Sequence, residues 1–263
     1  MVDNPIDKNL YLARISHLSG LTEETLKYME ELIKLKNGNI TDEERNLLFS
    51  SLKKSINFRR ESWRTVNALE SKEIKNQASL LPRVTQLKQT LVEEIKQYIN
   101  KAIDLIDNYL LKNAKKDELK LIYAKMKGDY MRYIIELTPK ENEEEINVLK
   151  EKADENYKIG LNLSYNLNNL NTNKIGLILN YTVFLYEFMK DFNNAYNIAN
   201  DFYQKAIKSI NDENIDLTSF KELNELLRLI SDNINKWKEI SEQENFYELV
   251  GGLSPNAANF TPI

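Results

Sequence analysis

The stretch TDEERNLLFSSLKKSINFRRESWR, residues 41–64, indicates the fold class of this chain. It contains neither glycine nor proline, and its charged residues are interspersed with leucine, isoleucine and phenylalanine. Thr41 and Glu44 have the spacing of a capping box, in which each side chain accepts a hydrogen bond from the backbone N–H of the other residue. The stretch therefore predicts a long helix that begins at residue 41.

Most of the remaining sequence is equally poor in helix-breaking residues. Residues 39–137 contain one glycine and one proline, and residues 140–250 contain two glycines and no proline. No alternating strand pattern with a hairpin turn occurs, so long helices joined by short loops are predicted. The predicted helices span residues 5–19, 22–37, 41–77, 82–113, 116–136, 139–160, 172–190, 193–210 and 219–242. Short connections imply antiparallel neighbours, and the predicted fold class is all-α, with nine antiparallel helices.

Several residues mark the predicted helix ends. Pro5 and Pro139 suit first helical positions, where a missing N–H costs nothing. Gly38 suits the end of a helix. Thr138 and Glu141 repeat the capping-box spacing. We expect one helical domain over residues 1–242.

The composition excludes several classes of protein. The 263 residues include no cysteine and a single histidine, His17, which excludes disulfides, thiolate zinc sites and multi-histidine metal sites. A formal net charge of -4 gives no overall attraction to nucleic acid or to an anionic membrane. The apolar stretch 175–189 is too short to span a bilayer, and residues 1–9 do not resemble a signal peptide. We expect a cytoplasmic protein without metal or cofactor, with the nucleus as an additional location.

Cations recur at a spacing of seven residues in two predicted helices. Lys53 and Arg60 form the first pair, and Lys125 and Arg132 form the second. Seven residues make almost two turns, with a drift of roughly 20°, so both members of a pair project from one face. Asp129 lies four residues after Lys125 and three before Arg132, and can hold both cations in place.

Facing cations repel each other unless an anion lies between them. Lys53, Arg60 and Arg132 with the Tyr133 hydroxyl would form a phosphate site, since guanidinium groups bind phosphate oxygens bidentately. The alternative is four solvated helix side chains with ordinary pairs within each helix.

Two further helix faces combine asparagine with apolar side chains. The first face contains Leu179, Asn180, Val183 and Glu187, and the second contains Leu229, Asn233 and Trp237. An amide in such a place can pair with the backbone of an extended peptide. The alternative is a core-facing stripe in which each asparagine is satisfied locally.

Four segments occur in order along the chain. They are Arg45-Asn-Leu-Leu48 with Arg59-Arg60-Glu61-Ser62-Trp63-Arg64; Lys125-Met-Lys-Gly-Asp-Tyr130 with Arg132-Tyr133; Gly176-Leu-Ile-Leu-Asn180 with Tyr186-Glu187; and Asp232-Asn233 with Trp237. These segments resemble the third, fifth, seventh and ninth helices of the 14-3-3 family. They cover the chain from about Asp42 to Trp237.

The resemblance implies a concave amphipathic groove lined by these four helices. It also implies that the protein is an adaptor without enzymatic activity, which clamps or masks phosphorylated client proteins in signalling. It implies partners that are phosphorylated proteins or peptides, and a homodimer or heterodimer with family members. The implied roles are phosphate binding for Lys53, Arg60, Arg132 and Tyr133; peptide-backbone binding for Asn180 and Asn233; and groove lining for Lys125, Leu179, Val183, Glu187, Leu229 and Trp237.

Two regions depart from the family pattern. The segment that resembles the ninth helix reads Leu227-Arg-Leu-Ile-Ser-Asp-Asn233, where the family usually has Leu-Leu-Arg directly before Asp-Asn, so one groove contact changes. The first two predicted helices match poorly, and the family dimerises through these helices and the start of the fourth.

Residues 243–263 are predicted to form a flexible tail, because residues 251–263 contain two glycines, two prolines and no charged side chain. Ser254 and Thr261 each precede a proline and are candidate sites for a proline-directed kinase. A phosphorylated Thr261 would resemble a carboxy-terminal ligand of the family, and the tail would then occupy its own or a neighbouring groove. The alternative is an unmodified tail.

The alternatives to phosphopeptide binding are a helical scaffold and an enzyme. A helical scaffold could bind partner proteins without phosphate, through other faces. An enzyme is disfavoured by the missing cysteines, the single histidine and the absence of a glycine-rich phosphate loop.

Overall fold

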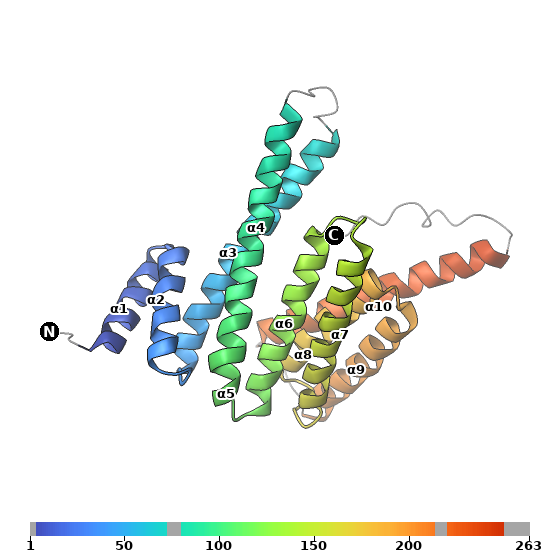
Figure 1. Cartoon of the computed structure of the whole chain (residues 1–263). Helices are drawn as coiled ribbons and strands as arrows, with labels where there is room; N and C mark the ends of the chain where they lie inside the picture. Colours follow the sequence, from blue (N-terminus) through green and yellow to red (C-terminus); the bar gives the residue numbers. More distant parts are fainter. Residues whose placement is uncertain (1–3, 73–79, 214–219, 250–263) are drawn as a thin grey trace. The chain divides into compact units, whose positions relative to one another are not determined.

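The computed structural model describes residues 4–72, 80–213 and 220–249, and within these ranges it contains helices and no strands (Figure 1). The helices are α1 (Pro5–Leu18), α2 (Thr22–Leu35), α3 (Asp42–Lys72), α4 (Leu81–Leu105) continued by η3 (Ile106–Leu110) and α5 (Leu111–Asn113), α6 (Asp117–Leu137), α7 (Glu143–Ser164), α8 (Thr172–Phe184) continued by η4 (Leu185–Met189), α9 (Phe192–Asp212) and α10 (Lys221–Leu249). With the two continuations counted as parts of α4 and α8, the described ranges contain nine helices. The predicted all-α class is confirmed.

The chain divides into two compact units, residues 1–115 and 116–263. In the first unit, α1 packs on α2, α2 on α3, and α3 on α4. Figure 1 shows α3 and α4 running side by side. The interior includes apolar side chains that are at most 1% exposed, among them Met29, Leu52, Ile56, Ile95 and Ile99.

Glycine is required at the end of α2. Gly38 has a φ of 80°, in the left-handed region that favours glycine. A Cβ at this position would also lie 2.2 Å from the carbonyl oxygen of Tyr109, so the backbone of η3 leaves no room for a side chain. The N–H of Gly38 donates to the carbonyl oxygen of Ile33 at 2.9 Å and satisfies one of the last carbonyl groups of the helix.

The predicted starts of α1 and α3 are confirmed. Pro5 is the first residue of α1, where Asn4 caps the helix by accepting a hydrogen bond from the N–H of Ile6. At α3, the N–H of Thr41 donates to Glu44 Oε2 at 2.8 Å, and the N–H of Glu44 donates to Thr41 Oγ1 at 3.2 Å. These two bonds are the predicted capping box.

The predicted start of α7 is wrong. Thr138 is buried and its hydroxyl donates to the carbonyl oxygen of Ile134 at 2.8 Å, so it belongs to the end of α6 and caps no helix. Pro139 lies in a turn closed by the N–H of Asn142, and α7 begins only at Glu143. The physical reason is burial, which commits the Thr138 side chain to the preceding helix.

Two helix ends also differ from their predicted positions. Gly160, the predicted end of α7, lies inside the helix, where a Cβ would approach Leu177 to 3.0 Å. This glycine permits close packing of α7 on α8 and does not end α7. The last helix runs to Leu249, beyond its predicted end at residue 242. The predicted end of α3, residues 73–77, lies outside the described residues.

The second unit contains α6 to α10, and its most extensive helix–helix contact joins α6 and α7. Tyr157 of α7 lies at the centre of an aromatic group, with its ring centroid 5.4 Å from those of Tyr181 and Phe184. A Cβ on Gly128 of α6 would lie 2.9 Å from the Tyr157 ring, so glycine allows α6 to approach α7 here. Among the helices of residues 4–72, 80–213 and 220–249, none combines the length with the apolar character of a membrane span.

Candidate functional site

Lys125 and Arg132 extend from one face of α6 and bind the same carboxylate. Lys125 Nζ donates to Asp129 Oδ2 at 2.9 Å, and Arg132 Nη2 donates to Asp129 Oδ1 at 3.3 Å. Side chains three and four residues apart are neighbours on a helix surface, which is why one aspartate reaches both cations. The prediction that Asp129 holds Lys125 and Arg132 is confirmed.

Two neighbouring helices contribute further donors to this carboxylate. Tyr157 of α7 donates its hydroxyl to Asp129 Oδ1 at 2.6 Å. Asn180 of α8 donates through Nδ2 to both oxygens of Asp129, at 2.8 and 2.9 Å. Asp129 is 6% exposed, and a buried charge needs such partners. We call Lys125, Asp129, Arg132, Tyr157 and Asn180 the Asp129 cluster.

The Asp129 cluster carries a net positive charge near neutral pH. Burial raises the pKa of Asp129. The charges of Lys125 and Arg132 and the hydrogen bond from Tyr157 outweigh this effect and lower the pKa to about 2. Burial lowers the pKa of Arg132, whereas Tyr157 and Asp129 raise it, and the net effect is an increase. Burial also raises the pKa of the Tyr157 phenol well above its usual value, so the phenol keeps its proton. Two cations therefore face one anion, which suits an anionic ligand.

Tyr133, the fourth residue of the predicted phosphate site, lies next to Arg132. The Arg132 Cζ is 5.0 Å from the centroid of the Tyr133 ring, within the range of a cation–π contact. Tyr130 meets the Tyr133 ring edge-on, with centroids 6.3 Å apart. The structure thus brings Arg132 and Tyr133 together on α6.

Lys53 and Arg60, the other two residues of the predicted phosphate site, lie on α3 in the first unit. Lys53 is exposed, whereas Arg60 is buried and 8% exposed. Arg132 and Tyr133 belong to the second unit. That all four residues meet around one phosphate stays a prediction.

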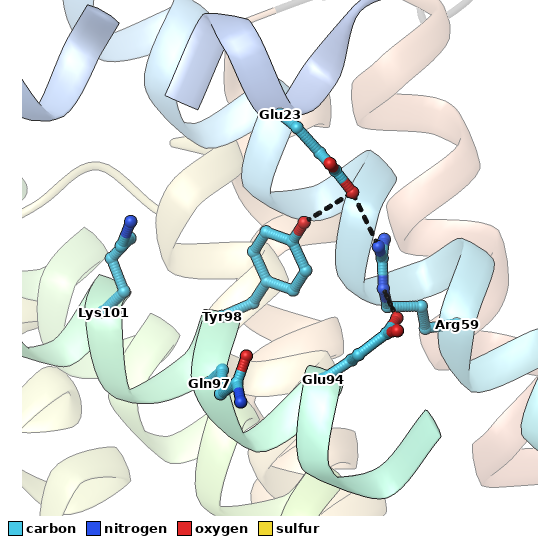
Figure 2. A pocket seen from close by; sticks show the side chains of 6 residues that line it. All are labelled: Glu23, Arg59, Glu94, Gln97, Tyr98 and Lys101. Carbon is cyan, nitrogen blue, oxygen red and sulfur yellow. Dashed lines mark hydrogen bonds and ion pairs between the residues drawn. The ribbon is translucent and has the colours of Figure 1, made fainter. Parts of the chain in front are cut away.

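Arg59, the residue before Arg60, has a different environment. It donates to Glu94 of α4 and, at 2.9 Å, to Glu23 of α2 (Figure 2). Tyr98 also donates to Glu23, at 3.0 Å, and the Arg59 guanidinium lies 4.6 Å from the Tyr98 ring centroid. The pocket in Figure 2 is lined by Glu23, Arg59, Glu94, Gln97, Tyr98 and Lys101. Arg59 therefore joins α2, α3 and α4, a role that its sequence position beside Arg60 did not reveal.

The predicted groove-lining residues of α8 and η4 are half-buried. Leu179 and Val183 pack against the core of the second unit. Glu187 is half-buried, and burial raises its pKa although Arg132 and Lys236 lower it. The groove-lining role of these residues stays a prediction.

The three residues predicted to share one face of α10 differ in burial. Leu229 is 43% exposed, Asn233 is half-buried and Trp237 is 6% exposed. The Trp237 ring stacks on Tyr186 of η4, with centroids 4.8 Å apart and an interplanar angle of 13°. Trp237 thus contributes to the core. The candidate phosphosites Ser254 and Thr261 lie outside the described residues.

Tyr157 is the site residue that sequence reasoning missed. It lies on α7, 28 residues from Asp129, and no spacing rule within one helix connects the two. The available signal was Gly128, since a glycine inside a helical pattern often marks a close approach of another element. That element is the Tyr157 ring.

Comparison with known proteins identifies the family. A family model described as "14-3-3 protein" matches residues 12–238, which include the whole Asp129 cluster. The chain belongs to the 14-3-3 family. Among its 14-3-3 relatives is 14-3-3 protein 3 of Entamoeba histolytica, which is 30% identical over 89% of this chain and 96% of that protein.

Two further 14-3-3 relatives give the same result. 14-3-3 protein 2 of Entamoeba histolytica is 29% identical over 87% of this chain and 94% of that protein. The 14-3-3-like protein A of Hordeum vulgare is 28% identical over 92% of each. The resemblance found in the four sequence segments is thereby confirmed, and membership of the 14-3-3 family supports a role as an adaptor that binds other proteins.

Proposed function

We propose that this 14-3-3 protein binds phosphoserine- or phosphothreonine-containing segments of client proteins and clamps or masks them, without catalysing a reaction. The observation that carries the proposal is the Asp129 cluster. A buried carboxylate holds Arg132 and Lys125 on one face of α6 at 3.3 and 2.9 Å, with an excess of positive charge. Fixed cations of this kind bind an oxyanion with little loss of side-chain entropy.

In this proposal Arg132 and Tyr133 bind the phosphate together with Lys53 and Arg60 of α3. Guanidinium groups bind phosphate bidentately, lysine adds a point charge and the phenol donates one hydrogen bond. Each charge-assisted bond contributes roughly 1.5–3 kcal/mol net. Three or four such bonds supply much of the ~8 kcal/mol that micromolar binding requires.

The peptide on either side of the phosphate is proposed to bind α8 and α10. Asn180 and Asn233 would pair with its backbone. The hydrogen bonds from Asn180 Nδ2 to Asp129 fix which way this amide faces. The side chains proposed to line the groove are Lys125, Leu179, Val183, Glu187, Leu229 and Trp237.

We further propose that the protein acts in the cytoplasm and forms a homodimer or heterodimer with family members. Phosphorylation of Thr261 would allow the tail to compete with clients, and Ser254 is the second candidate phosphosite. Sedimentation with and without phosphopeptide tests the dimer, and mass spectrometry of the native protein tests the two phosphosites. Detection of neither phosphosite would remove the tail hypothesis.

A pair of peptides tests the main proposal. A labelled Arg-x-x-phosphoSer-x-Pro peptide and its unphosphorylated twin are titrated against the full chain by fluorescence polarisation. We expect a large preference for the phosphorylated peptide that weakens with added salt. Arg132→Ala and Arg60→Ala should each nearly abolish binding while circular dichroism stays helical. Arg83→Ala, a change of an exposed arginine on α4, serves as the control and should bind as the wild type does.

Two results would contradict the proposal. Equal binding of both peptides would favour the alternative of a helical scaffold with phosphate-independent partners. Turnover of a phosphoester would favour an enzyme.

A further inference from the structure

The hydroxyl of Tyr157 contacts two of the three charged groups of the Asp129 cluster, Asp129 and Arg132. The hydroxyl donates its proton to Asp129 Oδ1 at 2.6 Å. Its oxygen accepts a hydrogen bond from Arg132 Nε at 3.4 Å. A phenol has one proton to donate and lone pairs to accept with. Because the proton is committed to a charged carboxylate, the lone pairs of the oxygen are available to the Arg132 N–H.

The position of this hydroxyl is set by the core of the second unit. Tyr157 is 0% exposed, and its ring lies between Tyr181, Phe184 and the backbone of α6 at Gly128. A ring packed this closely cannot swing away without opening a cavity. The phenol is therefore a fixed point against which Arg132 can be aligned.

The two contacts at Arg132 determine which edge of the guanidinium faces the protein. Nε donates to Tyr157 and Nη2 donates to Asp129, so the edge formed by these two nitrogens faces the cluster. A guanidinium is planar and has five N–H groups in a rigid fork. Fixing one edge therefore fixes the direction of the N–H groups on the rest of the fork.

We propose that Tyr157 is a positioning residue for phosphate recognition, which orients the Arg132 guanidinium by accepting a hydrogen bond from its Nε while holding Asp129. This inference rests on the proposed function, since it assigns Arg132 to the phosphate. Being fully buried, Tyr157 acts only through Arg132 and Asp129 and touches no ligand.

Tyr157→Phe tests the proposal, because it removes the hydroxyl and keeps the ring. Tyr181→Phe is the matched control. Tyr181 is also buried, and its hydroxyl also donates to a carboxylate, Asp154 Oδ1, at 2.9 Å. Asp154 is not part of the Asp129 cluster. We expect Tyr157→Phe to weaken binding of the phosphorylated peptide about tenfold, and Tyr181→Phe to change it less than twofold. Equal weakening by both variants would indicate general loosening of the core and overturn the inference.

A double-mutant cycle separates positioning from a structural role. Arg132→Lys retains a cation but lacks Nε, so Tyr157→Phe should have much less effect on phosphopeptide binding in that background. Additive effects of the two substitutions would overturn the inference. The unphosphorylated peptide should respond to none of these changes.

A readout without ligand distinguishes failure of the inference from failure of the proposed function. The Arg132 Nε–H signal in the NMR spectrum, assigned by its loss in Arg132→Lys, should shift in Tyr157→Phe and stay in place in Tyr181→Phe. An unchanged signal in Tyr157→Phe, with phosphate preference intact in the wild type, overturns the inference alone. Absence of phosphate preference in the wild type overturns the proposed function, and the positioning role falls with it.

Discussion

The amide nitrogen of Asn180 donates to both carboxylate oxygens of Asp129, at 2.8 and 2.9 Å. This contact joins α8 to α6 at the acidic side chain that also holds Lys125 and Arg132. A single buried carboxylate therefore fixes the relative positions of an amide and two cations from two helices. The stability of the second unit and its proposed binding role depend on the same group.

Removal of the Asp129 charge should destabilise the chain. Asp129→Asn keeps the shape of the side chain but leaves Lys125 and Arg132, with side chains 25% and 16% exposed, without their counterion. We expect a loss of about 3 kcal/mol in the free energy of unfolding, measured by urea denaturation. Asp201→Asn breaks an exposed pair with Lys205 on α9 and should cost less than about 1 kcal/mol. Equal losses in the two variants would contradict the importance of burial at Asp129.

The free energy of unfolding should fall in acid, because Asp129 becomes protonated. Its pKa is lowered in the folded chain from 3.8 to about 2, so the folded state favours the ionised form. The resulting stabilisation is fully present above pH 4 and is lost as the pH falls towards 2, and amounts to about 2 kcal/mol. Urea denaturation between pH 2 and 7 should show this loss in the wild type. Asp129→Asn should lack this component while keeping the pH dependence that other carboxylates produce.

An added methyl group should distinguish two helical glycines. A Cβ on Gly128 would lie 2.9 Å from the ring of Tyr157, which is packed on its other sides and cannot move aside. We expect Gly128→Ala to lower the unfolding free energy by about 1–3 kcal/mol through overpacking. Gly176→Ala brings its Cβ only to 3.6 Å from Lys125 Cε, and should be neutral or stabilise by up to about 1 kcal/mol. The opposite order in thermal denaturation would show that the α6–α7 contact is not as close as described.

The cap of α3 should contribute measurably to stability. Thr41→Ala removes the oxygen that accepts a hydrogen bond from the N–H of Glu44 at 3.2 Å, and should cost about 1 kcal/mol. Thr65→Ala makes the same chemical change at an exposed position inside α3, where the hydroxyl donates to the carbonyl oxygen of Glu61. Because alanine favours the helix interior, this control should be neutral or slightly stabilising. Urea midpoints of the two variants test the difference, and a loss at residue 65 as large as at residue 41 would argue against the cap.

The amino-acid sequence alone was enough to predict the helical class, the starts of α1 and α3, and the shared face of Lys125 and Arg132. Capping residues such as Thr41 and Glu44 act over three residues, and the pairing of Lys125 and Arg132 with Asp129 acts over one turn. Interactions this local can be read from spacing alone, which is why these contacts were predicted correctly.

Packing between the helices set which side chains from separate helices meet. It brought Tyr157 to Asp129, stacked Trp237 on Tyr186, enclosed Gly160 within α7 and committed Thr138 to the end of α6. Each of these outcomes depends on burial against a neighbouring helix. Burial is a property of how helices pack, and spacing along one helix does not contain it.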